Sequence, residues 1–106
     1  MLIWSSKIYL DQDISKRRKK YQHMLEKNKL RLPVYCITLP INGENTMEIY
    51  SSHELWFQYY RCQSLTLIGL AKTKEAAWKL AAQICLDTVC RNGEITPALI
   101  QEYFQD

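Results

Sequence analysis

The stretch SLTLIGLAKTKEAAWKLAAQICLDTVCR, residues 64–91, carries the strongest secondary-structure signals of the chain. Residues 64–71 are rich in aliphatic side chains and predict a strand. Gly69 within that strand predicts the close approach of a helix to the sheet. Thr73 is the expected N-cap of a helix over 74–91, and Gly93 is its expected stop.

The helix predicted over 74–91 is apolar around most of its circumference. At roughly 100° per residue, its polar side chains form one narrow stripe: Lys79, Gln83, Asp87 and Arg91. The remaining apolar arc spans roughly 240°, and a helix that lies on one sheet needs little more than about 100°. The helix is therefore expected to be buried on two sides. The second cover is either another helix of the chain or a second copy, and self-association would then use Trp78, Ala82, Cys85 and Val89.

Two more strands precede residue 64. VYCITL, residues 34–39, predicts a central strand covered on both faces, because both alternate sets of side chains are apolar or nearly so. Asn42-Gly43 is a strong hairpin signal and predicts a return strand over 46–50. For residues 2–10, both a strand at the sheet edge and an extended lead-in fit the pattern.

Three further helices are predicted. The first spans residues 13–28, where one face carries Ile14, Arg18, Tyr21 and Leu25. Ser51 and Glu54 have the spacing of a capping box and predict a short helix over 52–60. Thr96-Pro97 starts a last short helix, with an apolar stripe made of Leu99, Ile100, Tyr103 and Phe104.

These elements predict an α+β domain that covers residues 1–106. The expected sheet is small and antiparallel, with three strands, or four if residues 2–10 join as an edge. Its order is 2-1-3, which places the 34–39 strand between the 46–50 and 64–71 strands. The helices over 13–28 and 74–91 are expected to pack on one face of this sheet.

The length and amino-acid composition are those of an ordinary globular protein. The chain has 106 residues, of which 47% are hydrophobic and 24% charged. No stretch reaches the length of a membrane span, and the start lacks the basic region of a signal peptide. We therefore expect a cytoplasmic protein whose four cysteines are reduced.

The charge is unevenly distributed. Residues 1–31 carry nine basic and three acidic side chains, a net charge of +6, whereas the other 75 residues have a net charge of −3. The run Lys16–Lys20 has two readings, a solvated helix face and a surface that binds nucleic acid or another polyanion. The residues of the second reading are Lys16, Arg17, Lys19, Lys20, His23 and Lys27.

No catalytic, cofactor or metal site is predicted. Cys85 and Cys90 are five residues apart on a helix and point in different directions, which disfavours a shared metal ion. His53 and Glu54 are neighbours on a helix and do not face each other, and the capping box already explains Glu54. A reactive thiol at Cys62, beside Arg61, is a minor alternative.

The chain resembles a group of short uncharacterised proteins from Gram-positive gut bacteria. The resemblance is carried by VYCITLPINGENTMEIYSSHELWFQYY, residues 34–60, and LTLIGLAKTKEAAWKLAAQI, residues 65–84. It implies a compact bacterial domain and brings no catalytic residue with it. The favoured function is thus a small interaction or accessory domain, homodimeric and without chemistry of its own. The alternative is nucleic-acid binding through the basic face over 16–27.

Overall fold

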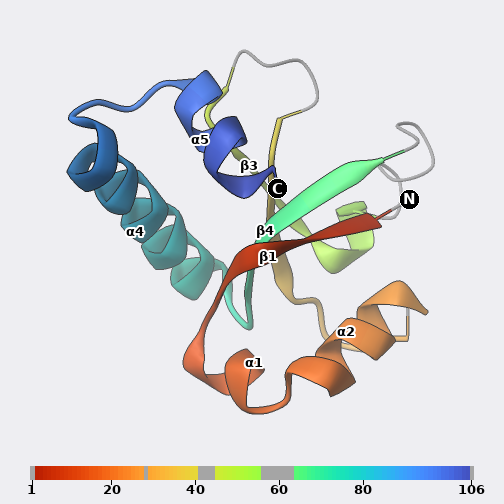
Figure 1. The fold of residues 1–106 in the computed structure, drawn as a ribbon. Helices are drawn as coiled ribbons and strands as arrows, with labels where there is room; N and C mark the ends of the chain where they lie inside the picture. Colours follow the sequence, from red (N-terminus) through yellow and green to blue (C-terminus); the bar gives the residue numbers. More distant parts are fainter. Residues whose placement is uncertain (1, 28, 41–44, 56–63, 106) are drawn as a thin grey trace.

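The computed structural model describes residues 2–27, 29–40, 45–55 and 64–105 and has an α+β fold (Figure 1). The elements follow one another as β1 (Leu2–Leu10), α1 (Gln12–Lys16), α2 (Arg18–Glu26), β2 (Tyr35–Thr38), β3 (Glu48–Ser51), β4 (Leu65–Ala71), α4 (Lys74–Asn92) and α5 (Pro97–Phe104). Residues 52–55, between β3 and β4, are also helical. The sequence predicted a helix over 52–60, and residues 56–60 of that prediction lie outside the described residues. The predicted Asn42-Gly43 turn also lies outside them.

The sheet has four strands in the order β1-β4-β2-β3. β2 pairs antiparallel with both β3 and β4, so the predicted neighbours of the 34–39 strand are confirmed. Residues 2–10 form the fourth strand, but β1 pairs parallel with β4. The prediction of a wholly antiparallel sheet is therefore wrong, whereas the edge position that the sequence allowed for residues 2–10 is confirmed.

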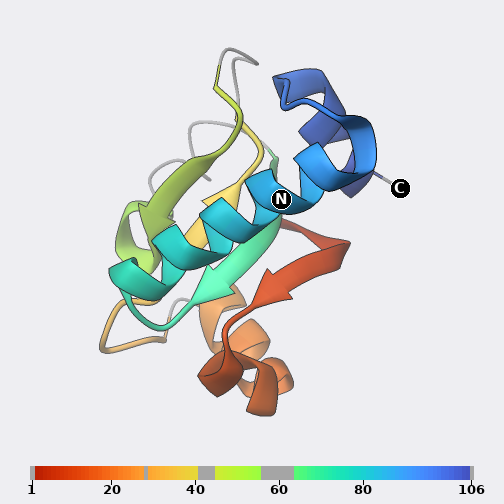
Figure 2. The ribbon, with the colours of Figure 1, turned by 90° about the vertical axis from the view of Figure 1, so that its left-hand side faces the viewer.

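Each face of the sheet has its own apolar core. One core contains Ile14 and Leu25 of the first two helices, packed on Cys36 and Leu67. The other contains Ala81, Ile84, Ile100 and Phe104 of α4 and α5, packed on Ile37 and Ile68. Figure 1 shows α1 and α2 on one side of the strands and α4 and α5 on the other, and Figure 2 shows α4 crossing in front of the sheet.

The prediction that the 13–28 and 74–91 helices share one face is therefore wrong. The reason is the strand pattern itself. β2 directs Cys36 to one core and Ile37 to the other, and both side chains are fully buried. A sheet that is apolar on both faces needs a helical layer on each of them.

Gly69 makes room for a neighbouring strand, whereas the sequence predicted the approach of a helix. A Cβ atom at this position would lie 2.8 Å from Cδ1 and 3.2 Å from Cβ of Ile37 on β2. The pairing of β2 with β4 shifts register at the same place, between Ile37 and Thr38. Glycine is thus required by the packing of two side-by-side strands.

The helix predicted over 13–28 is broken at Arg17, whose φ of −131° and ψ of 40° are not helical. Asp11 caps α1, because its Oδ1 accepts the N–H of Ile14 at 2.8 Å. Its Oδ2 accepts the backbone N–H of Lys72 at 2.7 Å. One carboxylate therefore fixes the start of α1 against the turn between β4 and α4.

The other predicted caps are confirmed. Thr73 Oγ1 accepts from the N–H of Ala76 at 3.1 Å, and Gly93 ends α4 in the left-handed region with φ of 80°. Thr96 Oγ1 accepts from the N–H of Leu99, with Pro97 in the first turn of α5. Ser51 and Glu54 form both hydrogen bonds of a capping box, at 3.2 and 3.1 Å.

Candidate functional site

The outer side of α4 is an exposed apolar surface, which we call the α4 face: Trp78, Ala82, Cys85, Leu86 and Val89. Trp78 is 60% exposed, Leu86 58% and Val89 38%. The inner side of α4 buries Ala77, Ala81, Ile84 and Thr88. Of the two covers that the sequence left open, another helix of the chain therefore does not bury this side among the residues that the structure describes.

A hollow of about 490 Å³ adjoins the α4 face. One wall is made by Met47 and Ile49 on and before β3, and the other by Trp78, Ala82 and Cys85. On this side of the sheet α5 contacts β1, and α4 contacts β4 and β2. The hollow therefore lies beside α4 at the β3 end of the sheet, and Met47 and Ile49 also pack against the core that α4 and α5 cover.

The six predicted nucleic-acid residues are all exposed, but they do not form one helical face. Lys16 belongs to α1, Arg17 is the break, and Lys19 and Lys20 begin α2. His23 is in the last turn of α2, and Lys27 is its C-cap. Arg18, which the helical spacing places among the apolar side chains, is exposed as well.

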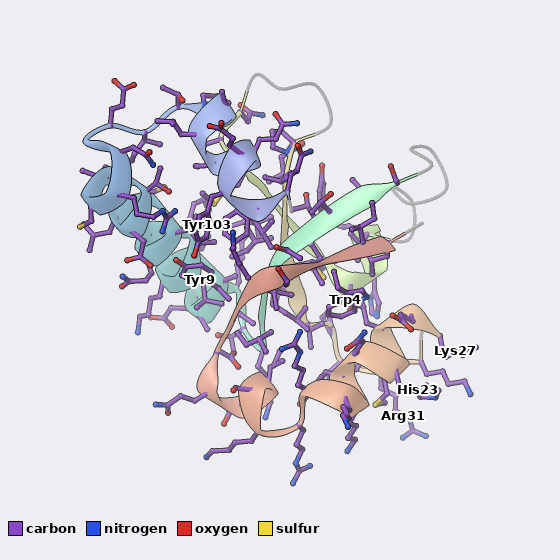
Figure 3. All side chains as sticks on the ribbon, viewed as in Figure 1. Trp4, Tyr9, His23, Lys27, Arg31 and Tyr103 are labelled. Atoms are coloured by element: carbon purple, nitrogen blue, oxygen red, sulfur yellow. The ribbon has the colours of Figure 1, made fainter. Side chains whose placement is uncertain are left out.

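A second hollow, which we call the end groove, lies where β2 begins and β4 ends. It has a volume of about 670 Å³. α2 contributes Tyr21 and Met24, the segment 29–35 forms one side, and the turn 72–74 forms the other. Among the described residues, its wall holds four cationic side chains and no acidic one: Lys29, Arg31, Lys72 and Lys74. Figure 3 labels Arg31, His23 and Lys27 at the α2 end of the molecule.

Sequence reasoning did not find the end groove. Its residues come from three separate segments, and those from 29–33 and 72–74 lie between predicted elements. The one available signal was that every charged residue in 27–31 and 72–74 is basic.

A polar and aromatic cluster joins β1, α4 and α5. The Tyr9 hydroxyl donates to Asp87 Oδ2, and Gln83 Nε2 donates to Asp87 Oδ1 at 2.8 Å. The Arg91 guanidinium lies 3.5 Å from the centre of the Tyr103 ring. Figure 3 shows Tyr9 and Tyr103 between α4 and the strands.

This cluster is suited to holding the elements together, not to acid–base chemistry. Burial, together with the Asp87 carboxylate, raises the pKa of Tyr9 to about 12. The hydrogen bonds from Tyr9 and then Gln83, aided by the Arg91 charge, lower the pKa of Asp87. Both groups therefore stay in their ordinary protonation states near neutral pH.

The remaining chemical candidates are not brought together. His53 is exposed, and its neighbour Glu54 is used in the capping box. Burial raises the pKa of the Cys36 thiol, which disfavours the reactive thiolate. Cys36, Cys85 and Cys90 are free cysteines, and Cys62 lies outside the described residues. Across the described ranges, no three His, Cys, Asp or Glu side chains are grouped as a metal ion would require.

In the comparisons with known proteins, no protein-family model, curated protein or solved structure matches the chain. In the part of the chain that the structure describes, no helix combines the length and hydrophobicity needed to cross a membrane.

Proposed function

We propose that the protein is a small self-associating interaction domain, without chemistry of its own, and that two copies pair through the α4 face. The observation that supports the proposal is that this exposed apolar face adjoins the hollow beside β3. Three of the six large apolar side chains that are exposed in the described ranges belong to α4: Trp78, Leu86 and Val89. A concentrated apolar patch of this kind is typical of a protein contact.

The spacing of the α4 face fits a twofold contact. Trp78, Ala82, Cys85 and Val89 are separated by four, three and four residues, the spacing of a helix-packing seam. The spacing is also symmetric about its midpoint, and a twofold axis requires a self-complementary surface. In an antiparallel pair of α4 helices, Trp78 would face Val89 of the second copy. Ala82 would face Cys85, so that two small side chains meet at the axis.

The second copy would also close the hollow beside α4. An α4 helix of the partner, placed beside this one, would lie over β3 and close the hollow against Met47 and Ile49. β3 is at the end of the sheet, and natural proteins usually cover or pair such an edge. The partner helix would therefore complete a layer that α4 and α5 begin.

The contact is expected to be reversible. Trp78 and Val89 are eleven residues apart, roughly 16 Å along the helix. A standard interface buries about 800 Å² per partner, and one helix face of this length supplies only part of that area. The proposed dimer should therefore dissociate on dilution.

Light scattering after size-exclusion chromatography tests this proposal at several protein concentrations. The unaltered chain is expected to approach the dimer mass as its concentration rises. Trp78→Glu should remain monomeric, because a desolvated carboxylate would oppose the contact. Leu32→Glu is the matched control, since Leu32 is 80% exposed and lines the end groove instead of the α4 face, and it should dimerise like the unaltered chain. A monomer at every concentration would contradict the proposal.

Cytoplasmic residence in a bacterium belongs to the same proposal. It is supported by the sequence resemblance described above. Cell fractionation tests the residence, and recovery of the protein with the membrane fraction would contradict it.

A further inference from the structure

We propose that the end groove binds single-stranded nucleic acid, with phosphates on its basic rim and bases against its aromatic and aliphatic wall. This site is separate from the α4 face and independent of self-association. It also differs from the surface that the sequence indicated, because most of its residues lie outside 16–27.

The first argument for a nucleic-acid ligand is the positive charge of the groove. Lys29 and Arg31 on one side and Lys72 and Lys74 on the other are all exposed, and no described residue forms an ion pair with any of them. Asp11, the acidic group that contacts the 72–74 turn, uses its carboxylate to accept two backbone N–H groups. The four cations therefore face the opening without an acidic partner from the described residues, and a polyanion is the ligand that complements them.

The amino end of α4 adds to the same field. Thr73 and Lys74 border the groove, and the first turn of a helix carries a partial positive charge. Because α4 has 19 residues, this end is well formed. Together with the four side chains, it makes the rim suitable for more than one phosphate.

The second argument is the aromatic and apolar lining of the groove. Two tyrosines, Tyr21 and Tyr35, and the apolar side chains of Met24 and Leu30 lie inside the ring of cations. A site for phosphate alone has no need of such a wall. Proteins that bind single strands combine a basic groove with aromatic side chains on which bases stack. The volume of about 670 Å³ is also in the range of sites that hold whole small organic groups.

A strand could continue beyond the groove. α2 contributes Tyr21 and Met24 to the wall and carries Lys20, His23 and Lys27 on its exposed side. Further phosphates would meet these cations along α2. We therefore expect a single strand to bind more tightly than a mononucleotide.

Concavity favours a nucleic acid over an anionic membrane. A membrane surface is approached by a projecting apolar segment, and of the groove's large apolar residues only Leu32 is so strongly exposed, at 80%. Tyr21 and Tyr35 line the hollow and are only partly exposed, so a flat bilayer would contact them less than a strand that enters the groove. Vesicles that contain phosphatidylserine are nevertheless included below as a competing ligand.

Fluorescence anisotropy with labelled oligouridylate and oligothymidylate tests the proposal at rising salt. Binding is expected at low salt and should weaken steeply as the salt concentration rises. Arg31→Gln and Lys74→Gln should each weaken binding several-fold and lower the salt slope by about one. Tyr35→Leu should weaken binding on the order of ten-fold with little change in the slope.

Two variants serve as controls. Lys79→Gln removes the same charge from an exposed position on α4 outside the groove and should bind like the unaltered chain. Trp78→Glu should also retain binding, which separates this proposal from self-association. Circular dichroism checks that the Tyr35→Leu variant is folded. If this variant is unfolded, Arg31→Gln and Lys74→Gln still test the groove.

Three outcomes would overturn the proposal. The first is the absence of binding to either oligonucleotide at low salt. The second is an equal loss in Lys79→Gln and Lys74→Gln, which would indicate attraction to net charge alone. The third is binding to phosphatidylserine vesicles without binding to either oligonucleotide.

Discussion

At the residue scale, Gly69 is the position where the sheet has no room for a side chain. It faces Ile37 on β2, and a Cβ would approach three atoms of that residue within 3.3 Å. Cδ1 can move by rotation about the side-chain bonds, but the Cβ of Ile37, at 3.2 Å, is fixed to the backbone. The two strands would have to separate, or the register at the shift between Ile37 and Thr38 would have to change.

We therefore expect Gly69→Ala to lower the free energy of unfolding by about 1–3 kcal/mol, the usual cost of overpacking a core. Urea unfolding measures the change. Ile37→Val removes Cδ1, the closest atom, and alone should cost about 1 kcal/mol. The double variant should be more stable than the sum of the two single effects predicts, because the two positions are in contact. Additive effects would contradict this account of Gly69.

Also at the residue scale, several side-chain roles could be predicted from the sequence. The caps at Thr73, Gly93 and Thr96 and the Ser51–Glu54 box depend on neighbours within four residues. Local hydrogen bonding suffices to specify them. The bond from the backbone N–H of Lys72 to the Asp11 carboxylate, by contrast, joins residues 61 positions apart. No local pattern contains that bond.

At the element scale, β1, α4 and α5 are held together by the Tyr9–Asp87 cluster. The hydroxyl of Tyr9 donates to a carboxylate that also accepts from Gln83. Tyr9 and Tyr103 each pack edge-on against Phe104, with ring centres 5.9 and 5.0 Å apart. The last helix is therefore connected both to the strand at one edge of the sheet and to α4.

Stability should depend on pH through this cluster. The pKa of Asp87 is lowered in the fold, so its contribution is present above the unfolded value of about 3.9. The contribution is lost as the pH falls through the folded value. The pKa of Tyr9 is raised to about 12, so its contribution is present below about 10 and is lost as the pH rises toward 12.

Asp87→Asn should therefore lose less stability than the unaltered chain when the pH falls below about 4, and Tyr9→Phe should lose less above about pH 10. Urea unfolding at a series of pH values measures both. Glu94→Gln is the matched control for the acid limb, since Glu94 is exposed and lies beyond α4. The same acid profile for Asp87→Asn and the unaltered chain would contradict the assignment.

The elements themselves were largely predictable, and their mutual placement was not. The alternation in 34–39 indicated a strand with two buried faces, and β2 is such a strand. The break at Arg17 has no Pro or Gly beside it, so nothing local marks it. The parallel pairing of β1 with β4 joins segments more than fifty residues apart. The pairing of two distant strands depends on how the helices and the sheet pack together. No short stretch of the sequence contains that information.

At the scale of the whole molecule, the two proposed surfaces are distinct. The α4 face and the hollow over β3 lie on the side of the sheet that carries the second core. The end groove opens between α2 and the start of α4, and most of the basic side chains of residues 1–31 lie on that part of the molecule. Pairing through Trp78 and Val89 would leave a groove on each copy.

The charge asymmetry of the sequence has a spatial meaning in this fold. The +6 of residues 1–31 is concentrated on β1, α1, α2 and the following segment, while α4 and α5 are part of a net acidic remainder. The sequence therefore identified the basic region correctly. It did not identify the end groove, because Lys72 and Lys74 reach that region only when β4 ends beside the start of β2.

The central claim is that a second copy covers the α4 face, and an intermolecular disulfide tests it most directly. Ala82→Cys is introduced into a chain in which Cys62 and Cys90 are replaced by Ser. In the antiparallel pair, the introduced thiol of one copy faces the natural Cys85 of the other, so mild oxidation should give a covalent dimer on a non-reducing gel. Gln83→Cys, one position away on the polar stripe, is the matched control and should form far less. Equal cross-linking of the two variants, or none in either, would contradict the pairing of the α4 faces.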